Sequence, residues 1–574
     1  MNSARNAKVA AYMIILPLLV LSVIMPQAIY AETYSDHFHS IDPSTQQNMQ
    51  LAPLPELRPE KSAPDITLPD LPEVKDDGLS SAVTVYVNKI TIKGNTILKD
   101  DELSVITNNY IGREISYMEL EQLRRALTEC YIKHGFINSG VVIPDQKVEN
   151  GELVLSAIEG KLTEIEVEGN KSFSADYIRK KLRYYSGTYL NVNELQQGLQ
   201  IMLQNPMIQR LNAELIPGLR AGEGTLKVKV QESQPLTLIV EGSNDHSPSI
   251  GSYGGDVFAA YRNLTGHGDI IRGSFTYTQG LMDGMAEYAI PLSVDDTTLK
   301  LNYRQNETIV IEDPFKNLDI KSRVKSLGVT LSRPFYKTTA TEFTLGVTSD
   351  LRFSETFLLG RSFSFTEGIS DGRTNIFVLR FFQEWSQRSQ TRVIAARCTI
   401  SVGVDAFNST MTESGPDGKF LAWLGQVQWI ERLFGTLNQL VVRTDAQYSK
   451  DPLLPLEKFS IGGMDSVRGY RNNVLVRDNG IFSSLEFRIP IYGSGSRPDI
   501  VQLVPFFDYG YSWNTKSVTP APKAISGTGL GIKWAITDKI LFQIYGAHPF
   551  RNVSVNNKDL QDRSVYFKLT TQVL

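Results

Sequence analysis

Cysteine is almost absent from this chain of 574 residues, which contains only two. Cys130 and Cys398 are too few for a disulfide framework, and neither lies in a CxxC or Cys/His pattern typical of a metal site. We therefore expect no metal and no cofactor. An excess of charge of one sign is also missing, since 58 Lys and Arg nearly balance 62 Asp and Glu. This balance disfavours nucleic acid as a partner.

Long apolar runs are missing after residue 31, where no segment reaches the about 18 consecutive apolar residues that a membrane helix needs. If the mature chain spans a membrane, it must therefore do so as a closed β-barrel. The mean hydropathy of −0.17 is compatible with a barrel, because polar residues that face the lumen alternate with apolar ones.

The amino-terminal residues 1–31 have the pattern of a secretory signal peptide. Basic residues precede an apolar stretch over residues 9–25, and Ala28 and Ala31 supply small residues where a peptidase cleaves. The alternative is a transmembrane anchor. Prolines interrupt and end the apolar stretch, and no positive flank follows it, so a signal peptide is favoured.

Residues 32–80 have the composition of a linker. Six prolines fall between residues 53 and 72, and their spacing excludes a long helix or a central strand. The preceding segment, residues 44–51, is long enough for a helix of about two turns. In isolation such a short helix is marginal, and disorder is the alternative.

Two tandem modules follow, over residues 81–160 and 161–235. The strand-like residues 85–95 recur as residues 162–170, and each copy ends in a Gly-Asn turn. A segment with helical periodicity follows each copy, at residues 117–134 and 192–205. Each module ends with segments in which polar and apolar residues alternate as in a strand. The pattern predicts two small α+β modules of order strand, helix, helix, strand, strand. Short sheets of this kind leave edges that can accept an extended client strand.

Residues 236–574 contain about sixteen alternating segments of about ten residues, separated by turn residues. The connections alternate in length. Those near residues 265–267, 293–296 and 387–390 are short, whereas residues 307–322 and 450–479 form long loops. This alternation of loop lengths is not expected of a soluble β-sandwich or propeller. It is expected of an outer-membrane barrel, which has short periplasmic turns and long external loops. We predict a transmembrane barrel of about sixteen antiparallel strands.

The longest loop, residues 450–479, carries the tip Val467, Arg468, Gly469 and Tyr470. Alternation along the neighbouring strands turns Asp508 and Glu486 into the lumen. If the loop folds back into the pore, Arg468 can bind these carboxylates through its planar guanidinium. The alternative is that Arg468 is an ordinary solvated arginine on a long loop.

Two modules, a barrel and the Val467–Tyr470 tip together resemble the outer-membrane transporters of two-partner secretion, of the haemolysin-activator and filamentous-haemagglutinin-exporter type. The first module resembles that family's polypeptide-transport-associated (POTRA) domain. The residues that carry this second likeness are Tyr131, Gly135, Phe136, Pro144 and Gln146.

The resemblance implies a bacterial outer-membrane pore that exports an unfolded partner protein, such as a haemolysin or an adhesin, with its POTRA domains in the periplasm. It also implies that the tip lies in the pore with Arg468 bound to Asp508 and Glu486, and that a plug helix, here residues 44–51, occupies the resting lumen. Outer-membrane lipid and the barrel-assembly machinery are the other implied partners. An alternative is a factor that inserts other barrels into the membrane. A passive porin would leave the two modules without a role.

Other candidate chemistry is sparse. His37 and His39 have no further ligands nearby, so a flexible segment is the favoured interpretation. The glycine-rich residues 526–531 lack the Lys-Ser/Thr ending of a phosphate loop, and a tight barrel strand explains them better. We find no triad or paired-carboxylate pattern and do not predict an enzyme.

We predict that the mature chain begins near Glu32 and fractionates with the outer membrane as a heat-modifiable barrel. Amino-terminal sequencing and membrane fractionation check this. Retention of residues 1–31, or recovery in the soluble fraction, would contradict the signal peptide and the barrel.

Overall fold

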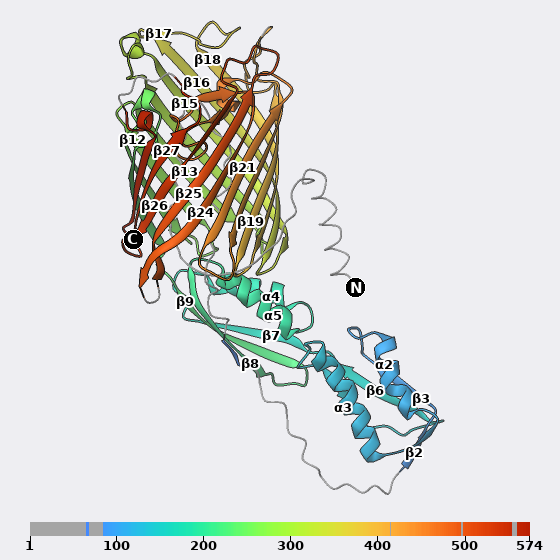
Figure 1. Cartoon of the computed structure of the whole chain (residues 1–574). Helices are drawn as coiled ribbons and strands as arrows, with labels where there is room; N and C mark the ends of the chain where they lie inside the picture. The colour runs from blue at the N-terminus through green and yellow to red at the C-terminus, as the bar shows by residue number, and fades with distance from the viewer. Residues whose placement is uncertain (1–64, 68–83, 414, 495–496, 554–558) are drawn as a thin grey trace.

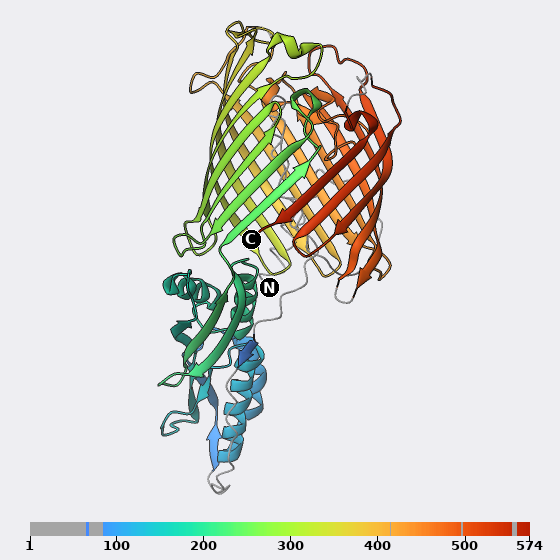
Figure 2. The ribbon, with the colours of Figure 1, turned by 90° about the vertical axis from the view of Figure 1, so that its left-hand side faces the viewer.

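A computed structural model describes residues 65–67, 84–413, 415–494, 497–553 and 559–574. The predicted signal peptide, the plug-helix candidate at residues 44–51, His37 and His39 lie outside the described residues. Figure 1 shows a tall barrel with two small modules in a row below one rim, and in Figure 2, turned by 90°, the modules still extend from that rim. The chain enters the barrel from the second module, and its carboxyl terminus lies at the same end.

The barrel consists of sixteen long strands among the described residues, each antiparallel to its neighbours, and β28 closes it against β10. The two-residue strand β17 (Arg361–Ser362) adds a small hairpin to β16. The sixteen are β10 (Leu236–Ser243), β11 (Gly254–Arg262), β12 (Ile270–Thr278), β13 (Leu281–Pro291), β14 (Thr298–Ile309), β15 (Lys321–Lys337), β16 (Thr341–Leu358), β18 (Arg373–Arg388), β19 (Arg392–Val404), β20 (Leu421–Arg432), β21 (Gln439–Ser449), β24 (Asn479–Ser494), β25 (Arg497–Trp513), β26 (Ala524–Ala535), β27 (Ile540–Pro549) and β28 (Val565–Gln572).

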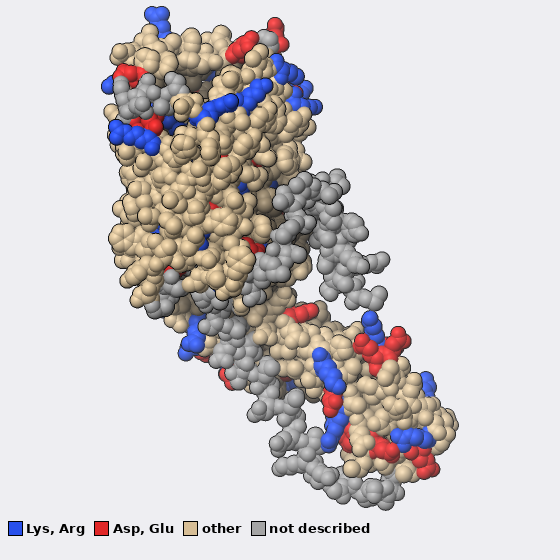
Figure 3. All heavy atoms as spheres, viewed as in Figure 1, with Lys and Arg blue, Asp and Glu red and all other residues tan. Residues whose placement is uncertain are grey.

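The predicted barrel is confirmed, and each predicted segment overlaps one of these strands. Alternation decides which side chains face outward. Along β25, Phe507, Tyr509 and Tyr511 are exposed, whereas Phe506 and Asp508 between them are buried. Figure 3 shows few charged side chains across the middle of the barrel wall on the face in view, and more at the upper rim and on the modules. Such a band suits contact with lipid. No helix of the described residues is long and apolar enough to cross a membrane.

The first module contains two short sheets and two helices. Strands β2 (Thr84–Val87) and β4 (Arg113–Ser116) pair with each other, and β3 (Lys89–Lys93), β6 (Glu152–Ile158) and β5 (Gly140–Val142) form the other sheet. The helices are α2 (Asp100–Thr107) and α3 (Tyr117–Lys133). The side chains of Leu123, Leu127 and Tyr131 lie on the buried face of α3 and pack in the core of the module. The predicted order of the first module is wrong in two respects. Strand β4 lies between its two helices, and the strand predicted over residues 85–95 is divided. The chain breaks at Asn88, and its two halves pair with different strands.

The second module has the predicted order. Strand β7 (Lys161–Glu168) is followed by α4 (Ala175–Ser186), α5 (Val192–Leu203), β8 (Ile208–Pro217) and β9 (Glu223–Glu232). Its sheet has the order β1, β8, β9, β7, in which β1 (Asp65–Thr67) comes from the proline-rich linker and pairs in parallel with Asn212–Glu214 of β8. The linker therefore covers part of the β8 edge.

A half-buried carboxylate supports the repeated Gly-Asn turn in each module. Glu159 accepts hydrogen bonds from the backbone N–H groups of Thr96 (2.5 Å) and Ile97 (2.8 Å). In the second module, Glu232 accepts bonds from three successive N–H groups, those of residues 171–173, at 2.7–3.0 Å. Burial opposes ionisation of Glu232, but these hydrogen bonds outweigh it and hold the pKa of the carboxyl below its usual range.

Glu232→Gln is predicted to destabilise the second module by on the order of 1–2 kcal/mol, because amide oxygen is a weaker acceptor than a carboxylate. Because folding lowers the pKa of Glu232, its carboxylate stabilises the module fully at pH values above 4.5, the ordinary pKa. This stabilisation is lost as the pH falls through the pKa of the folded state. Hydrogen exchange of residues 171–173, measured from neutral pH to well below the ordinary pKa of 4.5, checks both statements. Equal exchange in Glu232→Gln and wild type at neutral pH would show that the carboxylate does not support the turn.

Candidate functional site: a loop held inside the barrel

The loop between β21 and β24 folds into the barrel. It begins with a 3-10 turn (Pro455–Glu457), and its two arms pair as β22 (Phe459–Ile461) and β23 (Leu475–Arg477). Apolar side chains of the arms pack with Val467, Tyr470 and Phe482 in one buried cluster. The tip is therefore a packed element rather than a solvated loop.

Arg468 at the tip is 3% exposed and lies among inward side chains of β24 and β25. Its Nε and Nη2 donate to the two oxygens of Asp508 at 2.7 and 2.8 Å, and its backbone N–H donates to the same carboxylate at 3.0 Å. Nη1 donates to Glu486 Oε1 at 2.6 Å, and Nη2 also donates to Ser484 Oγ at 3.0 Å. The centre of the guanidinium lies 3.6 Å from the centroid of the Phe506 ring.

The structure thus brings together Arg468, Asp508 and Glu486, the three charged residues singled out from the sequence. The planar guanidinium makes contacts through both its edges and its face, because carboxylates lie at its edges and the Phe506 ring lies against its face. A lysine has neither the fork nor the flat face. The solvated arginine that the sequence left open as an alternative does not describe this environment.

The other three tip residues fix the backbone around Arg468. Gly469 has φ = +102°, and an added Cβ would approach Pro549 N to 3.2 Å. Its N–H donates to Tyr566 Oη at 3.0 Å. Tyr470 Oη donates to the Ser526 carbonyl at 3.0 Å. Val467 is fully buried. Each tip residue therefore has a separate contact with the loop's surroundings inside the barrel.

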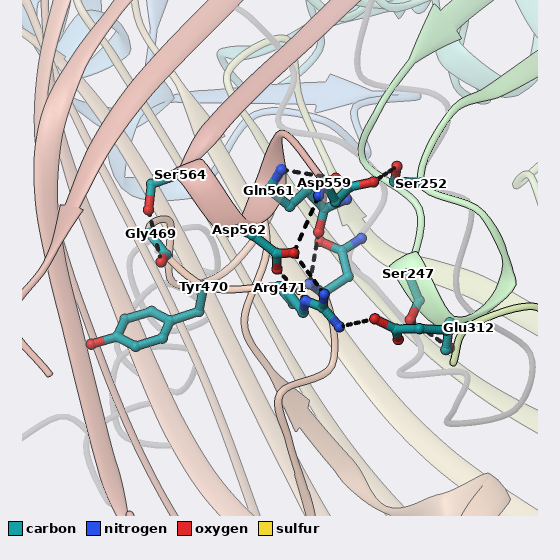
Figure 4. A network of polar contacts seen from close by, with 12 residues as sticks. Ser247, Ser252, Glu312, Gly469, Tyr470, Arg471, Asp559, Gln561, Asp562 and Ser564 are labelled. Carbon is teal, nitrogen blue, oxygen red and sulfur yellow. Dashed lines mark hydrogen bonds and ion pairs between the residues drawn. The ribbon is translucent and has the colours of Figure 1, made fainter. Parts of the chain in front are cut away.

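A second anchor, which no pattern in the sequence indicates, lies next to the tip. Arg471 donates Nη1 to Glu312 at 2.7 Å and Nη2 to Asp562 at 2.7 Å. Figure 4 shows Arg471 between these two acids, which come from two different loops of the barrel. Gln561 beside them donates to the carbonyl oxygens of Asn244 and His246. Three external loops are thereby tied to the long loop.

A third anchor holds the base of the loop. Glu457 accepts from Arg380 Nη2 at 2.8 Å and from Arg352 Nη1 at 3.0 Å, and Arg380 Nε also binds Asp350 at 2.9 Å. These residues of β16 and β18 are buried. Asp350 and Arg352 are two positions apart, which is the spacing of residues on one face of a strand. That spacing was the signal by which this anchor could have been found.

The candidate POTRA residues take part in the packing and hydrogen bonding of the first module. Tyr131 is buried, and its hydroxyl donates to Asn95 Oδ1 at 2.7 Å. Gln146 bonds both the N–H and the C=O of Val154, at 2.9 and 2.6 Å, and its Nε2 lies 3.4 Å from the carbonyl oxygen of Pro144. Gly135 has φ = +91° and faces the second module, and Phe136 packs against the first module's core.

Barrel, modules and an anchored pore loop define an outer-membrane protein transporter, and comparisons with known proteins identify its family. The family model "Haemolysin secretion/activation protein ShlB/FhaC/HecB" matches residues 222–534, and the model "POTRA domain, ShlB-type" matches residues 85–160. The chain belongs to this family of two-partner secretion transporters. It lies in the outer membrane with its POTRA domains in the periplasm.

Among curated relatives, the chain is 22% identical to the heme/hemopexin transporter protein HuxB of Haemophilus influenzae over 505 residues, which cover 82% of this chain and 84% of HuxB. It is 21% identical to the outer membrane transporter CdiB-2 of Burkholderia pseudomallei, with coverage of 78% and 76%. The solved structure of CdiB from Escherichia coli superposes with a TM-score of 0.65 at 17% identity, covering 88% of this chain and 93% of that one. The structural likeness shows the fold.

Arg468→Ala is predicted to release the tip, because it leaves the buried Asp508 without its guanidinium partner. Loss of one member of a buried ion pair costs about 3–5 kcal/mol. Arg468→Lys is expected to recover only part of this. Hydrogen exchange of residues 462–474 in the purified chain measures the release, and Arg361→Ala, at an exposed arginine of another loop, is the control. Protection of the tip in Arg468→Ala equal to wild type would mean that packing alone holds it.

Proposed function

We propose that this chain captures an unfolded secreted partner protein in the periplasm and conducts it outward through the barrel, in the manner of two-partner secretion. The observation that carries this proposal is the combination of a lumen containing an anchored loop with modules attached at the periplasmic rim. A passive pore needs no such modules. We expect the chain to act as a pore rather than as an enzyme.

Attachment of the second module to the barrel supports this proposal. Lys181 of α4 is buried and forms an ion pair with Asp296 in a short turn of the barrel, and Lys337 binds the same carboxylate at 2.9 Å. Gly266 of another turn accepts from Ser174 N–H at 2.9 Å, and Thr339 of a third accepts from Gln204 Nε2 at 2.7 Å. Contacts with three turns hold the module at the entrance of the pore.

The two modules are joined by backbone contacts. Gly160 accepts from Leu190 N–H and Gly135 accepts from Val192 N–H, both at 2.9 Å. Asn138 Nδ2 donates to the Gly222 carbonyl at 3.0 Å. The first two bonds join main-chain atoms of both modules and the third adds a side-chain link, so together they restrict rotation between the modules. A client held on either module is thereby kept in line with the barrel.

Capture by strand addition is the proposed mode of client binding. An extended client gains main-chain hydrogen bonds at a sheet edge without requiring a fixed sequence. The β8 edge is partly taken by Asp65–Thr67, so a client that adds there has to replace three residues of the linker. Such a short strand between prolines is a weak competitor for a longer client segment.

We also propose the division of the chain. Residues 1–31 are removed as a signal peptide, residues 32–80 form the linker with a possible plug, residues 81–160 and 161–235 are the POTRA domains, and residues 236–574 are the barrel. The tip residues Val467–Tyr470, with Asp508 and Glu486, set the position of the pore loop.

The second candidate function, insertion of other barrels, has one observation in its favour. BamA from Haemophilus ducreyi superposes with a TM-score of 0.53 at 13% identity. That likeness concerns the fold alone. Secretion of a partner and assembly of other barrels give different phenotypes, so one deletion separates them.

Deletion of residues 84–160 is predicted to abolish secretion of the partner protein, while the barrel remains folded, because capture and conduction belong to separate folding units. Secreted partner per heat-modifiable barrel is the measurement, and the abundance of other outer-membrane barrels is measured in the same cells. Normal secretion would overturn the capture mechanism. A loss of other barrels in a null strain would instead favour the assembly function.

A further inference from the structure

Three side chains of the first module have the chemistry of a metal site. Glu102 lies on α2, Cys130 lies on α3, and His134 caps the end of α3. The carboxylate, thiol and imidazole atoms all lie within 4.8 Å of one another. We propose that Glu102, Cys130 and His134 bind one Zn²⁺ ion. This departs from the expectation of no metal, and it does not depend on the proposed function.

The two residues of α3 are spaced for shared coordination. Cys130 and His134 are four positions apart, so their side chains lie on the same face of the helix. Glu102 reaches this face from the neighbouring helix, and its Oε2 lies 3.7 Å from His134 Nε2. An ion between them would be held by two helices rather than by one exposed turn.

The imidazole of His134 is oriented for a cation. Its Nδ1 lies 2.8 Å from the carbonyl oxygen of Cys130. Because a carbonyl oxygen can only accept, Nδ1 carries the hydrogen, and in the neutral ring the lone pair is on Nε2. Nε2 is the atom that faces Glu102. A histidine ligand whose other nitrogen donates to a backbone carbonyl is the usual arrangement in metal sites.

The donor set selects the metal. A thiolate with an imidazole and a carboxylate is typical of Zn²⁺ in tetrahedral coordination, with water as the fourth ligand. The side chains of Glu102 and His134 are 41% and 47% exposed, so an ion can enter from solvent. Burial and the negative charge of Glu102 raise the pKa of the Cys130 thiol.

Zinc at this position would stiffen the junction between the POTRA domains. The carbonyl of His134 accepts from Asn191 Nδ2 at 3.0 Å, and that of Gly135 accepts from Val192 N–H at 2.9 Å. Both hydrogen bonds are accepted by residues at the carboxyl-terminal end of α3, which the ion would link to α2. Bound zinc would therefore fix the segment from which the second module is held.

The test uses the full mature chain in detergent after treatment with a chelator. Calorimetric titration is expected to give one bound Zn²⁺, and Co²⁺ as a spectroscopic substitute is expected to give thiolate-to-cobalt charge-transfer absorption. Loss of even an outer-shell partner lowers metal affinity about 10- to 100-fold, so Cys130→Ser and His134→Ala are each expected to weaken binding at least about tenfold. Cys130→Ser should also abolish the charge-transfer band.

Two controls address the other possible ligands. Cys398→Ser removes the second thiol, and the double variant His37→Ala/His39→Ala removes the other histidine pair; both are expected to bind Zn²⁺ as wild type does. Hydrogen exchange of residues 100–107 and 130–135 should slow on addition of Zn²⁺ in wild type and not in Glu102→Gln.

Three results would overturn the site. They are the absence of Zn²⁺ binding by wild type, a charge-transfer band that survives in Cys130→Ser, and a loss of binding only in the His37/His39 variant. The Co²⁺ spectrum of wild type reports thiolate coordination before any variant is made, and comparison of Cys130→Ser with Cys398→Ser then assigns the thiolate to one of the two cysteines.

Discussion

The position of the pore loop depends on the guanidinium of Arg468 and the two carboxylates that surround it. Burying these charges costs free energy of hydration, and their mutual attraction roughly offsets that cost. The cluster therefore contributes more to where the loop lies than to how stable the barrel is. Any displacement of the tip that separates Arg468 from Asp508 leaves unpaired charge in a buried site, which is costly. This asymmetry explains why a long external loop has one defined path through the lumen.

The same principle is repeated along the loop. Glu457 binds two arginines of the wall at the base, Arg468 binds two acids at the tip, and Arg471 binds two acids of other external loops. In each case one loop charge meets two wall or loop charges of opposite sign. These polar anchors differ from an apolar seal, because water can solvate their charges once the loop moves. The loop is thus held in the lumen both by these charges and by the buried apolar cluster of its arms and tip.

Much of this architecture follows from local patterns. Strand alternation and the parity of loop lengths predict all sixteen strands, and alternation alone turns Asp508 inward. The tip could be proposed because its residues form a compact motif. The partners of Arg471 could not, since loop paths have no periodicity and here bring together Arg471 and Glu312, which lie 159 positions apart. The break at Asn88 was missed because both halves of that segment have strand composition, and only pairing with different partners divides them.

The central claim is that Arg468 and Asp508 work as one unit, and a double-mutant cycle tests it most directly. The quantity to measure is partner secretion per folded barrel in Arg468→Ala, Asp508→Ala and the double variant. If the residues act through their mutual contact, the double variant is little worse than either single one. Independent defects that add, or wild-type secretion by Arg468→Ala, would contradict the account.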